Sequence, residues 1–176
     1  KETLEIYGSL AHRLGIYNIK WQLEDLAFRY SYPEKYSEIK ELVEQTREER
    51  EVFIDDIILR IHDILEKAGI ASSIKGRPKH LYSIFQKLDK KNTSINQLYD
   101  LLGVRVVVNK LEDCYAALGI IHATFKPISE RFKDYIAISK PNGYQSLHTT
   151  VLTQDGKSVE VQIRTKEMNQ IAEIGF

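Results

Sequence analysis

The sequence predicts an α/β (α+β) fold in which a mixed β-sheet flanked by helices follows an all-helical segment. Three observations predict it. Apolar side chains recur at helical spacing through residues 1–70, and after residue 70 short β-branched runs alternate with helix-like segments. The dipeptide Asp155-Gly156 then separates two strand-like runs, which is a strong hairpin signal and requires at least one antiparallel pair.

The composition excludes a disordered or a membrane-spanning chain. Hydrophobic residues make up 43% and aromatic residues 10%, which is enough for a packed core. No apolar run approaches the roughly 20 residues that a membrane span needs. Cys114 is the single cysteine, so no internal disulfide can form and a reducing compartment fits. Because the chain also lacks a starting Met and a signal segment, we expect a piece of a longer cytoplasmic protein with no membrane contact.

The first seventy residues predict consecutive helices. One apolar stripe begins at Leu4, and a second helix follows Gly15. Pro33 suits the first position of a helix, and from there the spacing predicts one long helix that stops at Gly69.

The remaining residues predict alternating strands and helices. We expect strands over 70–75, 101–108, 144–153 and 157–164, and helices over 78–91, 111–125 and 166–174. The domain boundary therefore falls near residue 70, with a helical segment over 1–69 and an α/β domain over 70–176.

A focus of positive charge lies just after this boundary. The chain has zero net charge, yet residues 71–176 carry 15 basic and 10 acidic side chains. Six of these basic residues fall within residues 75–91, a stretch that contains only one acid, Asp89. They are Lys75, Arg77, Lys79, Lys87, Lys90 and Lys91. A local positive field of this kind attracts phosphate.

The expected helix 78–91 has two separate faces. Its apolar residues cluster on one side, and Lys79, Ser83 and Lys87, spaced four apart, line the roughly opposite side. A helix N-terminus with two lysines on one ridge could seat a polyphosphate. The alternative is an exposed basic helix.

Two acids stand out by position. Asp100 directly precedes the apolar strand 101–108, where a carboxylate can project from a strand end. In the strand 157–164, alternation places Glu160, Gln162 and Arg164 on one face and the apolar residues on the other. That polar face predicts either a solvated surface or a functional cleft, and in a cleft two carboxylates could hold Mg²⁺.

A third cluster runs from Arg131 to Ser146. Asn142-Gly143 after a proline favours a turn, which would display Tyr144 at the start of a strand. An exposed tyrosine beside Lys140 and Asn142 could stack on a nucleobase. The alternative is an ordinary turn followed by a core tyrosine.

Five motifs in this order closely resemble the synthetase domain of the Rel/Spo family of guanosine tetra- and pentaphosphate synthetases. They are Gly76-Arg77-Pro78-Lys79-His80, Tyr99-Asp100-Leu101 leading to Arg105, Arg131-Phe132-Lys133-Asp134-Tyr135, Asn142-Gly143-Tyr144-Gln145-Ser146 with His148, and Glu160-Val161-Gln162-Ile163-Arg164-Thr165. The resemblance covers nearly the whole chain, and residues 1–30 look like the tail of the hydrolase domain that precedes the synthetase in long members.

The resemblance implies a nucleotidyltransferase-like fold that transfers the β,γ-pyrophosphate of ATP to the 3′-hydroxyl of GDP or GTP. ATP and the guanine nucleotide are then the substrates, with Mg²⁺ (or Mn²⁺) as cofactor. Carried onto this chain, the family's site residues fall into four groups. The catalytic group would be Asp100, Glu160 and Lys133, with Asp100 and Glu160 at the metal; ATP would contact Arg77, Lys79, Ser83, Lys87 and Arg105; the acceptor would contact Lys140, Asn142, Tyr144, His148 and Gln162; and Arg131, Lys133 and Asp134 form the loop motif of the bifunctional type.

The resemblance also implies what lies outside this chain. The metal motif of the hydrolase would precede Lys1, so we expect no hydrolysis of the product by this piece, and the closing helix is expected to be truncated. Ribosome or tRNA contact is expected only through absent regions. Two other interpretations stay open: a non-catalytic guanine-nucleotide or RNA-binding regulatory module, and an enzyme that transfers a nucleotidyl group.

Overall fold

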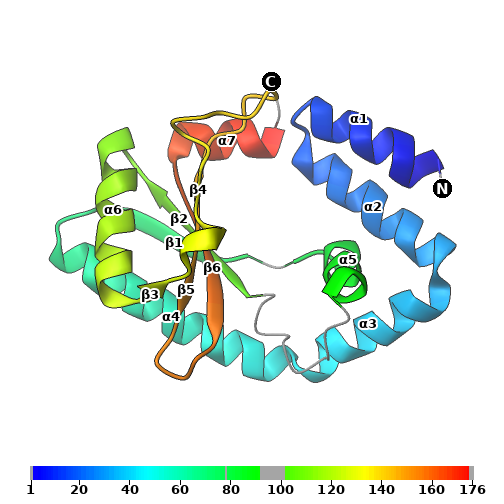
Figure 1. The fold of residues 1–176 in the computed structure, drawn as a ribbon, viewed down its shortest axis with the longest axis horizontal. Coiled ribbons are helices and arrows are strands. Elements are labelled where there is room, and N and C mark those ends of the chain that lie inside the picture. Colours follow the sequence, from blue (N-terminus) through cyan, green and yellow to red (C-terminus); the bar gives the residue numbers. More distant parts are fainter. Residues whose placement is uncertain (1, 78, 92–101, 175–176) are drawn as a thin grey trace.

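A mixed β-sheet forms the centre of the molecule (Figure 1). The structure is a computed structural model and describes residues 2–77, 79–91 and 102–174. Within these residues the strands follow the order β1-β2-β6-β5-β3, with β4 paired to β5; β2 and β6 are parallel and the other pairs antiparallel. The strands are β1 (Ser72–Gly76), β2 (Gly103–Val108), β3 (Lys126–Pro127), β4 (Lys133–Asp134), β5 (Leu147–Leu152) and β6 (Ser158–Thr165). The predicted mixed sheet is thus confirmed.

Helices before the sheet form an arc around one side of it (Figure 1). After a π-helical turn at Thr3–Tyr7, they are α1 (Gly8–Arg13), α2 (Tyr17–Ser31), α3 (Pro33–Gln45) and α4 (Arg47–Lys67). The later helices are α5 (Leu81–Lys91), α6 (Leu111–Thr124) and α7 (Lys166–Ile174), with a short 3₁₀ turn at Ser129–Arg131. No helix in the described ranges combines the length and the apolar composition needed to cross a bilayer.

The two faces of the sheet differ as the alternation of β6 predicts. Val159, Val161 and Ile163 are fully buried in a core to which α4 and α6 contribute. On the opposite face Arg105 of β2 lies beside Gln162 of β6 in the parallel register. Residues from both sides of position 70 therefore share one apolar core, whose burial stabilises the sheet by about 25 cal/mol per Å².

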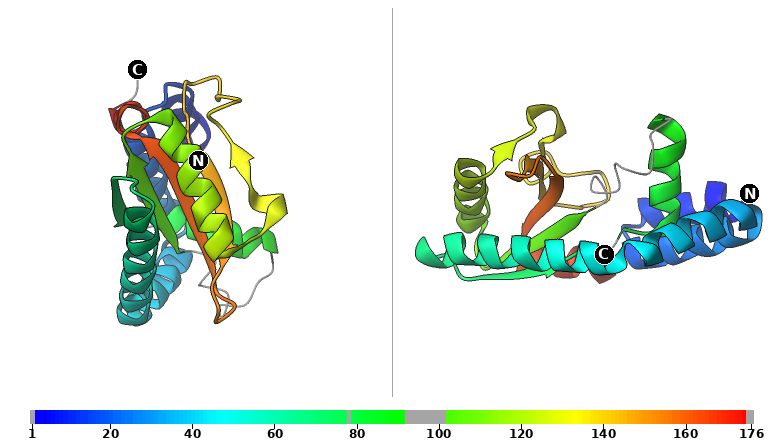
Figure 2. Two further views of the ribbon diagram at one scale, coloured as in Figure 1. Left: turned by 90° about the vertical axis from the view of Figure 1, so that its left-hand side faces the viewer. Right: turned by 90° about the horizontal axis from the view of Figure 1, so that it is seen from below.

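The single long helix predicted from Pro33 to Gly69 is wrong, because the chain breaks at Thr46 into α3 and α4. The Thr46 hydroxyl donates to the Leu42 carbonyl, which competes with helical hydrogen bonding. Arg50 donates from Nη2 to the Val43 carbonyl (2.7 Å) and from Nε to the Thr46 carbonyl, so carbonyls at the break are satisfied. In Figure 2 α3 and α4 follow each other almost end to end.

The helix predicted from residue 78 begins instead at Leu81, so Lys79 does not share a helical ridge with Ser83. Asp25 of α2 accepts a hydrogen bond from the Tyr82 N–H at 2.9 Å and thereby caps this helix from a distant element. The N-terminus of α5 is therefore occupied partly by a carboxylate. Its apolar side, with Ile84 buried, packs on Phe28 and Ile39 of the helical arc rather than on the sheet.

The predicted hairpin at Asp155-Gly156 is confirmed. Strands β5 and β6 pair antiparallel on either side of it, and Gly156 adopts a φ of 72°, which suits glycine. Strand β5 begins at Leu147 rather than at Tyr144. The preceding residues are held instead by loop contacts, including a hydrogen bond from the Tyr135 N–H to the Ser146 carbonyl.

Candidate functional site

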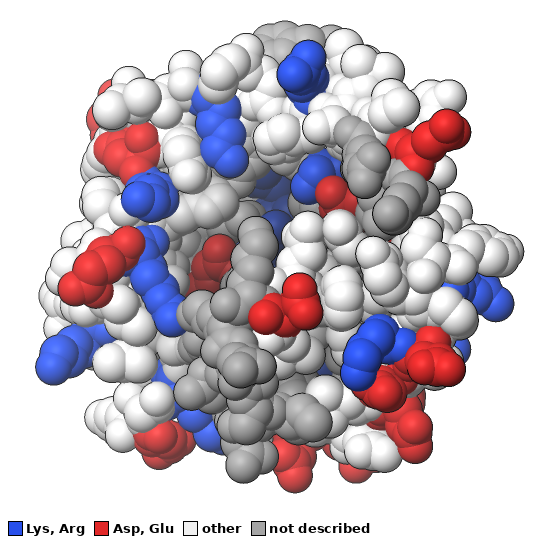
Figure 3. Space-filling model, turned by 45° about the vertical axis from the view of Figure 1, so that its right-hand side comes forward, with Lys and Arg blue, Asp and Glu red and all other residues white. Residues whose placement is uncertain are grey.

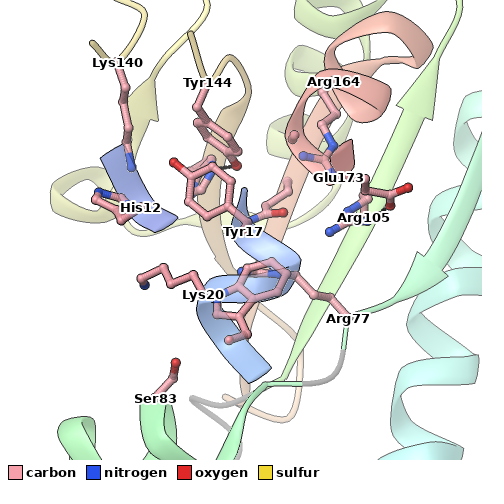
Figure 4. Close-up of a pocket in the computed structure, with 14 residues that line it drawn as sticks. His12, Tyr17, Lys20, Arg77, Ser83, Arg105, Lys140, Tyr144, Arg164 and Glu173 are labelled. Atoms are coloured by element: carbon pink, nitrogen blue, oxygen red, sulfur yellow. Dashed lines mark hydrogen bonds and ion pairs between the residues drawn. The ribbon is translucent and has the colours of Figure 1, made fainter. Parts of the chain in front are cut away.

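A cavity of about 530 Å³ lies over the polar face of the sheet, between β2, β6, α2, α5 and α7. Figure 3 shows this side of the molecule hollowed, with lysine and arginine side chains at the hollow. Its size is within the range of small-molecule sites. The lining residues are His12, Tyr17, Lys20, Trp21, Arg77, Ser83, Arg105, Lys140, Tyr144, His148, Gln162, Arg164, Ala172 and Glu173 (Figure 4).

The cavity unites residues that the sequence analysis placed in two separate groups. Arg77, Ser83 and Arg105 come from the expected ATP group, and Lys140, Tyr144, His148 and Gln162 come from the expected acceptor group. Lysine and arginine outnumber carboxylates among the described lining residues, where Glu173 is the single acid. A cavity with this charge favours an anionic ligand.

Glu160 lies beside this cavity in a cluster of cations. Its Oε2 is 2.8 Å from Nζ of Lys79 and 4.0 Å from Nη1 of Arg77. The side chain of Lys79 is only 8% exposed, whereas that of Glu160 is 27% exposed. Lys79, Arg77 and Glu160 thus lie together, and Lys79 reaches the carboxylate from an irregular segment and not from a helix.

Arg77 and Arg105 lie on neighbouring chain segments. The Arg77 N–H donates to the Gly103 carbonyl at 2.8 Å, which fixes Arg77 beside the start of β2. Its guanidinium lies 5.8 Å from the ring centre of Trp21, a cation–π contact. Arg105 donates from Nη1 to Glu173 at 2.9 Å, and burial together with the charge of Arg77 lowers its pKa.

Tyr144 is not displayed on the surface as predicted: it is 8% exposed. Its ring packs against Tyr17 at 5.3 Å and against Tyr135 at 6.2 Å, and its hydroxyl forms a 2.6 Å hydrogen bond with Nε2 of His148. Tyr144 therefore packs as a core tyrosine, which is the second of the two interpretations of the sequence. It still forms part of the cavity wall, so a ligand in the cavity can contact it.

The remaining acceptor residues surround this ring. Lys140 places Nζ 4.5 Å from the ring centre of Tyr135 and 5.2 Å from that of Tyr144, and burial lowers its pKa. Asn142 donates to the His12 carbonyl (2.8 Å) and to the Tyr17 hydroxyl (2.9 Å). Asn142 thus joins the Tyr144 loop to α1 and α2, and it is not among the residues that line the cavity.

The loop motif lies away from the cavity wall. Arg131 and Lys133 are exposed, and Lys133 is paired through the backbone with His148. Asp134 accepts hydrogen bonds from the N–H groups of Ile136 and Ala137, which makes it a turn-stabilising residue in this structure. Asp100 lies outside the described residues, and of Lys87 only its position on α5 is described.

Sequence reasoning missed the contribution of the helical segment to this site. His12, Tyr17, Lys20 and Trp21 all line the cavity, although they precede the predicted boundary by about fifty residues. One available signal was the spacing of Tyr17 and Trp21, four residues apart, which places both aromatic rings on one face of a helix. Arg164 of β6 also lines the cavity, although the sequence analysis gave it no role beyond its place on the polar face with Glu160 and Gln162.

His148 provides a pH-dependent prediction. Burial lowers its pKa to about 4, with further lowering by Arg77, Lys140 and Arg164 and an opposing effect of Glu160. Between pH 6.5 and about 4 the unfolded chain binds a proton that folded His148 excludes, so the free energy of unfolding falls as the pH is lowered. His148→Gln should make this fall shallower in denaturant titrations at pH 7 and pH 5. Burial also lowers the pKa of His12 and His122, so a residual slope is expected; an unchanged slope contradicts the assignment to His148.

The donor set near Glu160 is compatible with Mg²⁺. Among the described residues no three His, Cys, Asp or Glu side chains gather as a metal-binding group. Mg²⁺ is commonly held by one or two carboxylates together with substrate phosphates and water, however, and Glu160 is a partly exposed carboxylate beside the cationic cavity. Asp100 is the second carboxylate of the metal site predicted from the sequence.

The fold is that of an alarmone synthetase. The chain resembles the small alarmone synthetase 1 from Bacillus subtilis bound to its product pppGpp, with a TM-score of 0.56, 25% identity and coverage of 70% of this chain and 72% of that one. Residues 76–176 match the family model described as a region found in RelA/SpoT proteins. The chain therefore belongs to the RelA/SpoT family.

Longer relatives carry two different names. A GTP pyrophosphokinase from Escherichia coli (strain K12) is 47% identical over 99% of this chain, which covers 24% of that protein. A guanosine-3′,5′-bis(diphosphate) 3′-pyrophosphohydrolase from Aquifex aeolicus is 49% identical over all of this chain, which covers 25% of that protein. The chain thus spans about a quarter of the length of these relatives.

Proposed function

We propose that this chain transfers the β,γ-pyrophosphate of ATP to the 3′-hydroxyl of GDP or GTP, as a cytoplasmic (p)ppGpp synthetase of the stringent response. The observation that carries the proposal is the shared cavity in which Arg77, Ser83 and Arg105 meet Lys140, Tyr144, His148 and Gln162 beside Glu160. The name of the Escherichia coli relative and the pppGpp bound by the Bacillus subtilis synthetase support the same activity.

The chemistry requires the acceptor 3′-oxygen to bond to the β-phosphorus of ATP while the bond from that phosphorus to the α,β-bridging oxygen breaks and AMP leaves. Lys79 would neutralise the charge on the transferring group, which is the main demand of phosphoryl-type transfer. Glu160 would accept the proton of the 3′-hydroxyl, provided that ATP draws Lys79 away from its carboxylate.

Aromatic and planar groups would position the two bases. Arg77 and Arg105 lie on adjacent segments and carry planar guanidinium groups that can stack on adenine. Tyr144 would stack on guanine once the Tyr17 ring yields part of its contact. A Mg²⁺ ion held by Asp100 and Glu160 would supply further charge neutralisation on the phosphates.

The direct test is to incubate the protein with ATP labelled in its terminal phosphates, GDP and Mg²⁺, and to identify the products. Formation of AMP together with a guanosine nucleotide that has gained both labelled phosphates supports the proposal. Release of pyrophosphate with a nucleotidyl group on the acceptor would identify a different transferase. Binding of both nucleotides without any product would identify a regulatory binding module.

Tyr144→Ala is expected to weaken GDP binding by about 1–3 kcal/mol, the usual contribution of stacking on a base, while ATP binding is nearly retained. Because Tyr144 is buried, the variant should also unfold at a lower temperature. Calorimetric titration below that temperature separates the two effects. Tyr144→Phe is the matched control, since it keeps the ring and removes the hydroxyl that bonds to His148. Equal losses for GDP and ATP in Tyr144→Ala would make Tyr144 a packing residue alone.

A further inference from the structure

Arg164 is a buried cation that the proposed chemistry leaves unused. It lies on β6, is 2% exposed, and lines the cavity. Its Nε donates to Oδ1 of Asn169 on α7 at 3.1 Å, while Nη2 has no hydrogen-bond partner among the described residues. A buried donor left unsatisfied is unfavourable, and more so when it is charged, so a ligand acceptor at this position would remove that penalty.

The neighbours of Arg164 make its charge unfavourable in the free protein. Burial and the nearby Arg105 and Arg77 lower its pKa to about 10, which still leaves the guanidinium charged at neutral pH. The negative charge of Glu173 raises the pKa of Arg164, but the Glu173 carboxylate accepts its hydrogen bond from Arg105 and not from Arg164. Figure 4 shows Arg164 at one side of the cavity, between Tyr144 and the pair formed by Arg105 and Glu173.

The position of Arg164 on its strand indicates which part of a nucleotide it faces. Glu160, Gln162 and Arg164 share one face of β6, and residues four apart on a strand are separated by roughly 13 Å. With the reacting 3′-oxygen at Glu160 and the base against Tyr144, the ribose lies near Gln162 and the base extends toward Arg164. Phosphate groups suit more open cations such as Lys20, whose side chain is 23% exposed.

We propose that Arg164 determines base specificity, with its free Nη2 donating to O6 of the acceptor guanine. This inference rests on the proposed function, because it requires a guanine nucleotide in the cavity. Guanine presents a hydrogen-bond acceptor, O6, at position 6, whereas adenine presents an amino group there. That amino group is a donor, so it could not accept a hydrogen bond from Nη2 of Arg164. A charge-assisted hydrogen bond in a buried setting would therefore both bind guanine and reject adenine-like bases.

The test compares the binding of GDP with that of the 5′-diphosphate of 2,6-diaminopurine riboside, which has an amino group at position 6. Calorimetry is performed on the wild type, on Arg164→Met and on Lys166→Gln. Lys166 is exposed, lies two residues further along, and controls for a general loss of positive charge. Arg164→Met should reduce the preference for GDP about tenfold, as expected for the loss of one charge-assisted hydrogen bond, and Lys166→Gln should leave it unchanged.

Other results would overturn the inference. It fails if Arg164→Met keeps the wild-type preference for GDP over the diaminopurine analogue, or if Lys166→Gln changes that preference equally. So does a variant that keeps the base preference but no longer binds GDP more tightly than GMP, because Arg164 would then contact phosphate. If Arg164→Met does not fold, Arg164→Gln keeps a neutral donor and should give an intermediate preference, and an unchanged one overturns the inference. A wild type that binds no GDP refutes the proposed function itself, which is a separate result.

Discussion

Glu160→Gln is expected to lower the rate of pyrophosphate transfer at least a hundredfold, which corresponds to roughly 3 kcal/mol of transition-state stabilisation. The amide can neither accept the 3′-hydroxyl proton nor contribute charge to a metal site. ATP binding should be retained, because Lys79 and Arg77 lose a competing carboxylate. Product formation and ATP titration, measured on the same preparation, check both parts of the expectation.

The same substitution should also lower stability, since Lys79 is nearly buried and loses a carboxylate 2.8 Å away. We expect a loss of roughly 1–3 kcal/mol in the free energy of unfolding. Glu167→Gln, an exposed acid in the first turn of α7, is the matched control and should change neither quantity. A Glu160→Gln protein that unfolds early while its folded fraction transfers pyrophosphate at the wild-type rate would assign Glu160 to the scaffold.

Asp100→Asn is expected to produce a comparable loss of at least two orders of magnitude in rate, about 3 kcal/mol. The substitution keeps the size of the side chain and removes only its charge, so the effect should arise through Mg²⁺ and not through packing. The dependence of the rate on Mg²⁺ concentration is the second measurement, and it should shift to higher concentrations if activity is detectable.

Asp155→Asn provides the control for Asp100, because Asp155 is exposed in the hairpin turn and Asn-Gly also favours that turn. Near-normal transfer by folded Asp100→Asn, with an unchanged Mg²⁺ dependence, would remove Asp100 from the metal site. Glu160 would then be the remaining candidate ligand.

Local patterns predicted the sheet well because they depend on neighbouring residues. The alternation along 159–164 fixes which side chains enter the core, and Asp155-Gly156 marks the hairpin, so both features could be predicted from a few positions. The helix start at Leu81 could not be predicted, since its cap, Asp25, lies 57 residues away from Tyr82. Contacts between distant segments have no signature in a single sequence.

In the candidate site, too, features set by local sequence could be predicted and features set by contacts between distant segments could not. The motifs identified the cavity-lining residues between positions 77 and 162. They did not predict that Tyr144 is covered, because that depends on how α2 places Tyr17 against its ring. Tertiary packing of α2 therefore decides the exposure of a residue whose own local sequence favours a surface turn.

The shared cavity wall has a thermodynamic consequence. Tyr17 and Glu173 lie at opposite ends of the chain yet line the same cavity, so the cavity exists only while α2 is docked against α7. A ligand that contacts both sides must then stabilise the docked arrangement by its own binding free energy, about 2.7 kcal/mol at a concentration one hundred times its Kd. Nucleotide binding and the docking of the helical arc are thus linked equilibria, and amide hydrogen exchange along α2 should slow when the cavity is filled.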